Sequence, residues 1–170
     1  MSIKDPKWHV VYTMSKNEKK IFNTLTKQKI YSFLPLHQLT RQWCDRKKHI
    51  HVPIFPNYVF VKICPDQKWM VQSICGVIRF VSFGNMLAVV PDHEIDIIKK
   101  LEANNIEVSH ETNWVKGDKV RIIRGPLTGL EGVINDKRGE GRLFLELKAI
   151  DRIVSISIDS HSIQMAHEFV

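Results

Sequence analysis

The side chains best suited to chemistry are spread along this chain without forming a recognisable catalytic or metal-binding motif. Cys44, His49 and His51 are close in sequence, but their spacing fits no familiar zinc pattern and a fourth ligand is missing nearby. Acidic residues at 92–96 cluster where a helix is expected to start, a position that favours carboxylates through the helix dipole. No Gly-rich phosphate loop, nucleophile elbow or zinc-protease motif is present. The sequence therefore predicts a protein that is not an enzyme and that holds neither a metal nor a cofactor.

Positive charge is the most informative property of the composition, because it is confined to one part of the chain. The 170 residues carry a net charge of +7. Residues 1–110 hold 16 Lys and Arg against 9 Asp and Glu, whereas residues 111–170 hold 9 of each kind. This division indicates a first part that lies near nucleic acid and a second part that meets a protein. Many basic proteins bind no nucleic acid, so charge alone leaves both interpretations open.

Neither the apolar runs nor the first residues indicate a membrane or secreted protein. No apolar run reaches the roughly 18 residues that span a bilayer. Residues 1–7 are polar and charged, without the apolar core of a signal peptide. The three cysteines are an odd number and far apart, which argues against a disulfide framework. We therefore predict a cytoplasmic protein with free thiols.

Residues 1–103 alternate between strand and helix patterns. Aromatic and β-branched residues at 8–12 predict a first strand. Ser15, with Glu18 three residues later, is typical of a capping box at the start of a helix. Prolines at 53 and 56 should delay a later strand until Asn57, because proline cannot donate a hydrogen bond to a strand ladder.

The rest of this first part continues the alternation. Asp66 is suited to cap a short helix, and Gly84-Asn85 fits a hairpin turn between two short strands. A last helix opens at residues 91–92, and its apolar positions recur every three residues, at Ile95, Ile98 and Leu101. The order strand, helix, strand, strand, helix, strand, strand, helix predicts an α/β sandwich around a mainly antiparallel sheet.

A polar stretch at 104–113 predicts a linker, after which the pattern changes to short strands. Apolar and polar residues alternate around Val120, Leu145 and Ile156, which is the period of a strand, and glycine-containing turns separate the runs. About 58 residues of this kind predict a small closed all-β barrel, since closure removes exposed strand edges. The predicted boundaries are 1–103 for the first domain, 104–113 for the linker and 114–170 for the second domain.

Three motifs, taken in order, resemble the NusG family of transcription factors. Residues 117–134 (GDKVRIIRGPLTGLEGVI) resemble the KOW motif, and residues 53–61 (PIFPNYVFV) resemble the signature of the NusG N-terminal domain. Residues 8–13 and 76–91 fit the same domain in order and spacing. The resemblance covers nearly the whole chain and implies an α+β fold: an N-terminal α/β sandwich with an antiparallel sheet, then a small all-β, SH3-like KOW barrel. Within the family, the chain looks more like the specialised antiterminators of the RfaH and UpxY kind.

The resemblance implies a non-enzymatic adaptor for transcription elongation and antitermination. Its first domain would bind the coiled-coil clamp helices of the largest RNA polymerase subunit, through aromatic anchors in an apolar depression. The positions that match the family are Tyr12, Phe55, Pro56 and Tyr58. Phe55 and Tyr58 are expected to touch the partner and Phe60 to be core, although alternation turns about half of a strand's side chains inward.

Two basic segments are candidates for nucleic-acid contact. By the resemblance, residues 41–51 (RQWCDRKKHIH) form a hairpin tip that points at upstream DNA, and residues at the start of the first helix contact the non-template strand. The candidates in the hairpin are Arg46, Lys47 and Lys48, and those of the helix, expected on one helical face, are Lys16, Asn17 and Lys20. The alternative for each segment is an ordinary solvated surface.

In the family, the KOW domain recruits either the termination factor Rho or a small-subunit ribosomal protein. Leu127 and Leu130 stand where housekeeping members carry phenylalanines, which disfavours Rho and favours antitermination. The β-branched alternation at 153–158 predicts a domain that stays a barrel. We expect a monomer without membrane contact. The alternative function is a ribosomal or RNA-binding KOW protein, which would carry excess positive charge on the barrel as well.

Overall fold

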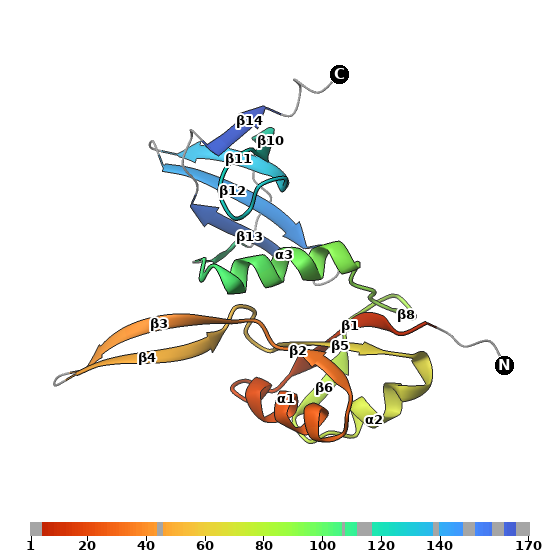
Figure 1. The fold of residues 1–170 in the computed structure, drawn as a ribbon. Coiled ribbons are helices and arrows are strands. Elements are labelled where there is room, and N and C mark those ends of the chain that lie inside the picture. Colours follow the sequence, from red (N-terminus) through yellow and green to blue (C-terminus); the bar gives the residue numbers. More distant parts are fainter. Residues whose placement is uncertain are drawn as a thin grey trace. The chain divides into compact units, whose positions relative to one another are not determined.

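The structure is a computed structural model, and it divides the chain into two compact units, residues 1–95 and 96–170. It describes residues 5–43, 46–106, 108–111, 117–137, 140–147, 152–157 and 162–165. Each unit has its own antiparallel sheet (Figure 1). Among the described residues, no helix combines the length and the apolar composition that a membrane-spanning segment needs.

The first unit is built on a four-stranded antiparallel sheet with the strand order β2-β5-β1-β6. Two further antiparallel pairs, β3-β4 and β7-β8, form hairpins. Helix α3 runs across the division between the units. The elements in chain order are β1 (Lys7–Thr13), α1 (Glu18–Lys27), β2 (Tyr31–Phe33), β3 (Leu36–Trp43), β4 (Arg46–Pro53), β5 (Tyr58–Ile63), the 3-10 helix η1 (Pro65–Gln67), α2 (Lys68–Gln72), β6 (Val77–Phe80), β7 (Ser82–Phe83), β8 (Met86–Leu87) and α3 (Asp92–Ala103).

Helices α1 and α2 cover one face of the four-stranded sheet (Figure 1). Ile21 and Leu25 lie four residues apart on α1, so that both point to the same side of the helix. They are buried in one cluster with Val11 and Val59 of the sheet and Val71 of α2. Burying an aliphatic side chain of this size contributes about 1.5–3 kcal/mol relative to leaving it exposed. This layer therefore fixes β1 and β5, the strands that carry the predicted anchors.

Aromatic side chains occupy the opposite face of the sheet, because successive residues of a strand point to opposite sides. Trp8 of β1 meets Tyr31 of β2, with the ring centroids 5.3 Å apart. Phe60 of β5 contacts Phe33 and Phe55, at centroid distances of 6.2 Å and 6.0 Å. These distances are typical of favourable aromatic pairs. The face is therefore held by ring contacts between strands, and Trp8, Phe55 and Phe60 are buried in it.

The second unit contains a six-stranded antiparallel sheet with the order β14-β10-β11-β12-β13-β9. Val120 and Ile122 of β10 are buried on either side of the half-buried Arg121, as the period of two predicts, and Leu143 of β12 and Ile156 of β13 are buried as well. Glycine is required at 132, where a Cβ would lie 2.6 Å from the backbone oxygen of Phe144 on the neighbouring strand. The strands are β9 (Ser109–Glu111), β10 (Asp118–Ile122), β11 (Glu131–Lys137), β12 (Glu140–Leu147), β13 (Arg152–Ser157) and β14 (Ile163–Met165).

The predicted fold class is confirmed: an α+β unit with an antiparallel sheet is followed by a small all-β region. The hairpin turn at Gly84-Asn85 is also confirmed, between β7 and β8. Helix α3 is the predicted last helix, and its residues Ile95, Ile98 and Leu101 are buried. β9 falls within the stretch predicted as a linker and pairs with β13.

The predicted capping box at the start of α1 is wrong. Asn17 is the residue that precedes the helix, and no side-chain hydrogen bond caps it. Glu18 is buried, and its carboxylate accepts a hydrogen bond from the backbone N–H of Asn57. A long-range partner therefore replaces the local one.

The prolines delay β5 as predicted, since it begins at Tyr58, next to the expected Asn57, after the irregular residues 54–57, and Pro53 ends β4. The prediction for Asp66 is corrected. Asp66 lies inside η1, and the side chain of Gln67 accepts the backbone N–H of Cys64 at 3.1 Å. Asp66 therefore precedes neither short helix as its capping residue, a position held by Cys64 for η1 and by Gln67 for α2.

Candidate functional site

Strands β6, β1 and β5 bring three side chains into line across the sheet. Tyr12 pairs with Arg79 on one side and with Tyr58 on the other. The two tyrosine rings meet edge to face with their centroids 5.4 Å apart, and the guanidinium carbon of Arg79 lies 5.8 Å from the centroid of the Tyr12 ring. Both tyrosines are half-buried and Arg79 is exposed. These three residues, called the tyrosine row below, combine ring surface with polar groups that a partner can reach.

Phe55 is part of the core and not of the exposed surface. Its side chain is 1% exposed and packs edge to face on Phe60. The chain turns sharply here, because the N–H of Tyr58 donates to the C=O of Phe55 at 3.3 Å, and Pro56 is left exposed at the corner. The prediction that Phe55 touches a partner is therefore wrong for this structure, whereas Phe60 is core as predicted.

The turn at residues 55–58 is held through the backbone of Asn57. This residue has the left-handed φ of 69°. Its N–H donates to Oε1 of Glu18 at 2.8 Å, and its C=O accepts the N–H of Thr13 at 2.8 Å. Glu18 is 5% exposed, so its carboxylate is largely shielded from water. The turn is thus tied both to the end of β1 and to the start of α1.

The residues predicted to contact the non-template strand lie at the start of α1, but they do not share one helical face. Lys16 is exposed and precedes the helix, with the left-handed φ of 64°. Asn17 is half-buried, and its Nδ2 donates to the C=O of Ser15 at 3.3 Å. Lys20 alone lies within α1, and it is exposed. The spacing argument for a common face is therefore wrong, since the helix begins two residues after Lys16.

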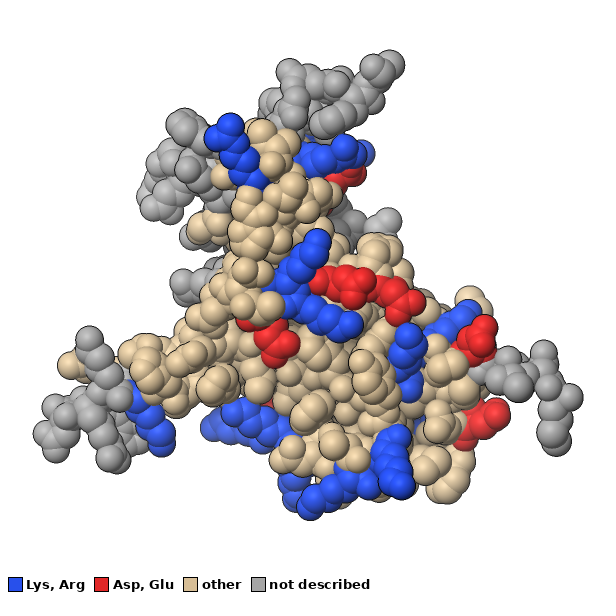
Figure 2. All heavy atoms as spheres, viewed as in Figure 1, with Lys and Arg blue, Asp and Glu red and all other residues tan. Residues whose placement is uncertain are grey.

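Basic side chains are concentrated along α1. Figure 2 shows Lys and Arg side chains gathered along one edge of the first unit. In Figure 1, which has the same orientation, α1 forms this edge. The exposed lysines of this edge are Lys16, Lys19, Lys20, Lys27 and Lys29. One of them also has a structural contact: Nζ of Lys19 donates to the C=O of His51 on β4 at 2.6 Å. This bond ties α1 to the neighbouring hairpin.

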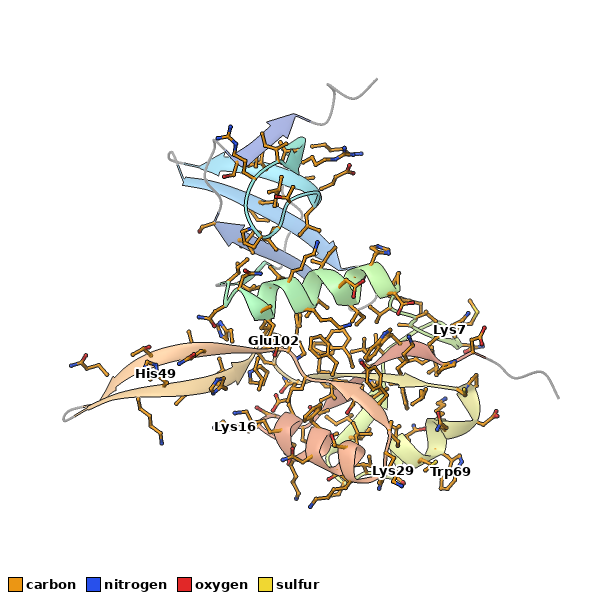
Figure 3. All side chains as sticks on the ribbon, in the orientation of Figure 1. Lys7, Lys16, Lys29, His49, Trp69 and Glu102 are labelled. Carbon is orange, nitrogen blue, oxygen red and sulfur yellow. The ribbon has the colours of Figure 1, made fainter. Side chains whose placement is uncertain are left out.

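The β3-β4 hairpin extends away from the four-stranded sheet (Figure 3). Its strands pair from Leu36 with Pro53 to Trp43 with Arg46. Of the predicted phosphate contacts, Lys48 is exposed, while the side chains of Arg46 and Lys47 lie outside the described part of the chain. The predicted hairpin is therefore present, and the three candidate residues lie on β4, whereas the further basic residue Arg41 lies on β3.

One histidine of this hairpin, His49, has a hydrogen-bonding partner on the facing strand. Nδ1 of His49 lies 3.1 Å from Oγ1 of Thr40 on the facing strand. Cys44, the third member of the candidate metal set, lies outside the described residues. Within the described part, no group of three or more His, Cys, Asp or Glu side chains is placed to hold a metal ion.

In the second unit, the connection between β10 and β11 contains both predicted partner-binding leucines, and both are buried. Leu127 is 5% and Leu130 is 9% exposed. The connection folds back on itself: Gly129 donates to the C=O of Ile122 at 2.8 Å, and Leu130 donates to that of Leu127 at 3.1 Å. The prediction that the two leucines contact a partner directly is therefore wrong for this structure. The exposed apolar residue of this connection is Ile123.

Comparison with known proteins assigns the chain to a family. Residues 6–99 match the sequence model of the family described as "Transcription termination factor nusG", which is more than half of the chain. The chain belongs to the NusG family.

Similarity to individual NusG proteins extends over nearly the whole length. The transcription termination/antitermination protein NusG of Haemophilus influenzae is 22% identical over 180 residues, which cover 98% of this chain and 97% of that protein. The NusG of Lactococcus lactis is 26% identical over 174 residues, covering 94% and 93%. A solved structure described as "Domain interaction in Thermotoga maritima NusG" has a TM-score of 0.60 and 24% identity, and it covers 95% of this chain and 97% of that one. The similar structure supports the NusG fold.

Family membership makes this chain a NusG-type transcription termination/antitermination factor. NusG proteins are transcription factors and not enzymes, so the prediction of a non-enzymatic factor is confirmed.

Three residues of this NusG-family chain have roles that sequence reasoning missed. The spacing of Glu18 indicates a local cap, whereas its bond to Asn57 joins positions 39 residues apart. Arg79 enters the tyrosine row through the pairing of β1 with β6, which places it opposite Tyr12, and the register shifts only beyond this pair, between Tyr12 and Thr13. The exposure of Ile123 could have been predicted from the sequence. It comes directly after Ile122, the last residue of β10, and so breaks the alternation of apolar and polar residues in that strand.

Proposed function

We propose that the first unit of this NusG-family protein binds the clamp helices of the largest RNA polymerase subunit. Tyr12, Tyr58 and Pro56 make the contact, and Phe55 supports their turn from the core. The tyrosine row carries this proposal, because tyrosines on a fixed sheet offer a large contact area at little cost in side-chain entropy. Arg79 adds a cation beside the rings, suited to a polar group of the partner.

Nucleic acid is the second proposed partner of the same unit. In this proposal Lys16, Asn17 and Lys20 contact the non-template strand. The hairpin residues Arg46, Lys47 and Lys48 contact phosphates of the upstream duplex. The distribution of charge supports both contacts, since the net charge of +7 is contained within residues 1–110. Phosphate contacts of this kind orient a protein on DNA without reading its sequence.

The second unit is proposed to recruit a further protein, either a small-subunit ribosomal protein or Rho. Its balanced charge is better suited to a protein than to nucleic acid. In this proposal Leu127 and Leu130 support the β10-β11 connection from inside, and the exposed Ile123 takes part in the contact. Linking the two units raises the concentration of the recruited protein at the transcribing polymerase. We assign the chain to the specialised antiterminators of the RfaH and UpxY kind, acting as a monomer in the cytoplasm.

A pull-down of core RNA polymerase with the tagged full-length chain tests the proposed function. Tyr12→Ala and Tyr58→Ala should each weaken binding about tenfold, because each removes an anchor ring. Tyr31→Ala is a matched control, since Tyr31 is a 63% exposed tyrosine on the same sheet outside the tyrosine row. Polymerase binding that survives both row substitutions would exclude this surface. Recovery of ribosomal subunits without polymerase would favour the ribosomal alternative instead.

A further inference from the structure

We propose that Glu18 is a positioning residue that holds the 55–58 turn against the start of α1. It thereby fixes the proposed polymerase contact relative to the proposed contact with the non-template strand. The inference rests on the proposed function, but its structural part can be measured separately.

The position of Glu18 is unusual for a surface helix. It is the first residue of α1, yet its side chain is buried. Burying a carboxylate is costly unless hydrogen bonds and favourable charge offset the loss of water. Here the N-terminus of α1 favours a negative charge, and the N–H of Asn57 donates to Oε1 at 2.8 Å. The carboxylate therefore has a defined partner in the turn.

The turn depends on its backbone bonds rather than on the Asn57 side chain. Among the described atoms, the buried Oδ1 of Asn57 has no hydrogen-bond partner. Its N–H and C=O, in contrast, bond to Glu18 and Thr13, both at 2.8 Å. Pro56 and Tyr58 flank this residue directly. Any rotation of the Asn57 peptide therefore moves both proposed polymerase contacts.

The segment that leads into α1, on the other side of the bond between Glu18 and Asn57, is also held by backbone hydrogen bonds. Asn17 immediately precedes Glu18, and its C=O accepts the N–H of Ile21, a buried core residue of α1. The N–H of Met14 donates to the C=O of Gly76 at 2.8 Å, which anchors the segment before the helix. The segment that carries Lys16 and Asn17 is thus hydrogen-bonded at both ends. Glu18 joins this segment to the turn.

Removing the acceptor would leave the N–H of Asn57 without its bond in a largely buried place. A buried donor without a partner is costly, so the turn is expected to move until water reaches it. Pro56 and Tyr58 would then lose part of their preorganisation, and association would have to restore it. Glu18 itself need not touch polymerase or DNA for this effect.

Two conservative variants of the full-length chain separate the hydrogen bond from the charge. Glu18→Gln keeps the length and an acceptor oxygen but removes the charge. Glu18→Asp keeps the charge at the helix N-terminus but is one methylene too short to reach Asn57. We expect Glu18→Asp to bind core polymerase about tenfold more weakly and Glu18→Gln to stay within about threefold of the unsubstituted chain. Non-template crosslinking should fall in parallel with polymerase binding.

Hydrogen exchange of the Asn57 amide gives a readout that needs no partner. Protection should persist in Glu18→Gln and disappear in Glu18→Asp, while the amides of α1 remain protected in both. Glu94→Asp is the matched control, since Glu94 is also a buried glutamate in the first turn of a helix. That control should leave both Asn57 protection and polymerase affinity unchanged.

Retained affinity and Asn57 protection in folded Glu18→Asp would overturn the inference. A loss of affinity in Glu18→Gln with full binding in Glu18→Asp would also overturn it, because charge and not the hydrogen bond would then matter. If the unsubstituted chain fails to bind polymerase, the proposed function is wrong. The exchange measurement still decides in that case whether Glu18 holds the turn.

Discussion

At the scale of single residues, Gly76 shows how tightly the start of α1 is packed. Its φ of 98° is rarely adopted by residues with a side chain. A Cβ at this position would lie 3.3 Å from Cδ1 of Ile21 and 3.4 Å from Cβ of Asn17. Backbone conformation and space therefore both favour glycine here.

Gly76→Ala is expected to lower the free energy of unfolding by about 1–3 kcal/mol, since it combines backbone strain with a close contact. Urea denaturation of the full chain measures this change. Gly84→Ala is the control, because Gly84 also has a positive φ, of 58°, but nothing lies within 4 Å of an added Cβ. A Gly76→Ala variant no less stable than Gly84→Ala would mean that α1 starts in looser surroundings than the structure describes.

Single residues are also where sequence reasoning is least accurate. Ser15 and Glu18 have the spacing of a capping box, and no local rule predicts that the carboxylate finds Asn57 instead. Phe55 is expected to touch a partner because it stands in the segment that resembles the family signature. Its inward direction follows from the sharp turn to Tyr58, which depends on long-range bonds to Asn57.

At the scale of elements, the β3-β4 hairpin is the part that we propose reaches DNA. It is a two-stranded ribbon with eight register pairs, held at its base by the bond from Lys19 to His51. A ribbon anchored at one end can hold basic side chains at a distance from the body of the unit. The predicted basic residues of the hairpin all lie on β4.

Replacing Arg46, Lys47 and Lys48 together by Ala should weaken binding to a polymerase complex with an upstream fork. The slope of log affinity against log salt concentration should become shallower by about 0.9 for each phosphate that these side chains neutralise in the unsubstituted protein. Titration over a range of salt concentrations measures the slope. The hairpin's proposed role would be contradicted by a weaker complex with an unchanged slope.

The elements themselves could be predicted better than the way they pair. The alternation around Val120 and the helical spacing of Ile21 and Leu25 are local patterns, and they correctly predicted strands and a helix. The alignment of Tyr12, Tyr58 and Arg79 depends on register across three strands, and the pairing of two of them shifts at a bulge or irregularity. Register is set by packing and turns, which a single sequence does not specify in advance.

At the scale of the whole molecule, charge is divided between the two parts of the chain. Lys119 and Arg124 are exposed cations of the second unit, but this part of the chain carries as many acidic as basic residues. Arg121 of the same unit is engaged in an ion pair with Glu131. The long-range attraction to nucleic acid should therefore originate in the first part.

Replacing Lys119 and Arg124 by Ala should accordingly leave the salt dependence of binding to the transcribing complex unchanged. The measurement is the same salt titration, and Lys16→Ala with Lys20→Ala is the matched double variant in the first unit. That double variant should make the slope of log affinity against log salt concentration shallower by about 1–2. An equal effect of both double variants would place the second unit on nucleic acid and favour the RNA-binding alternative.

The position of β1 has a consequence for how the chain is made. It is synthesised before both of its neighbours in the sheet, which are β5, beginning at Tyr58, and β6, ending at Phe80. While the ribosome is still translating the segment between them, the apolar β1 has no strand to join. Pairing between distant segments is slow, and a waiting strand can associate with other nascent polypeptides. The chain is therefore most prone to aggregate before residue 80 has left the exit tunnel.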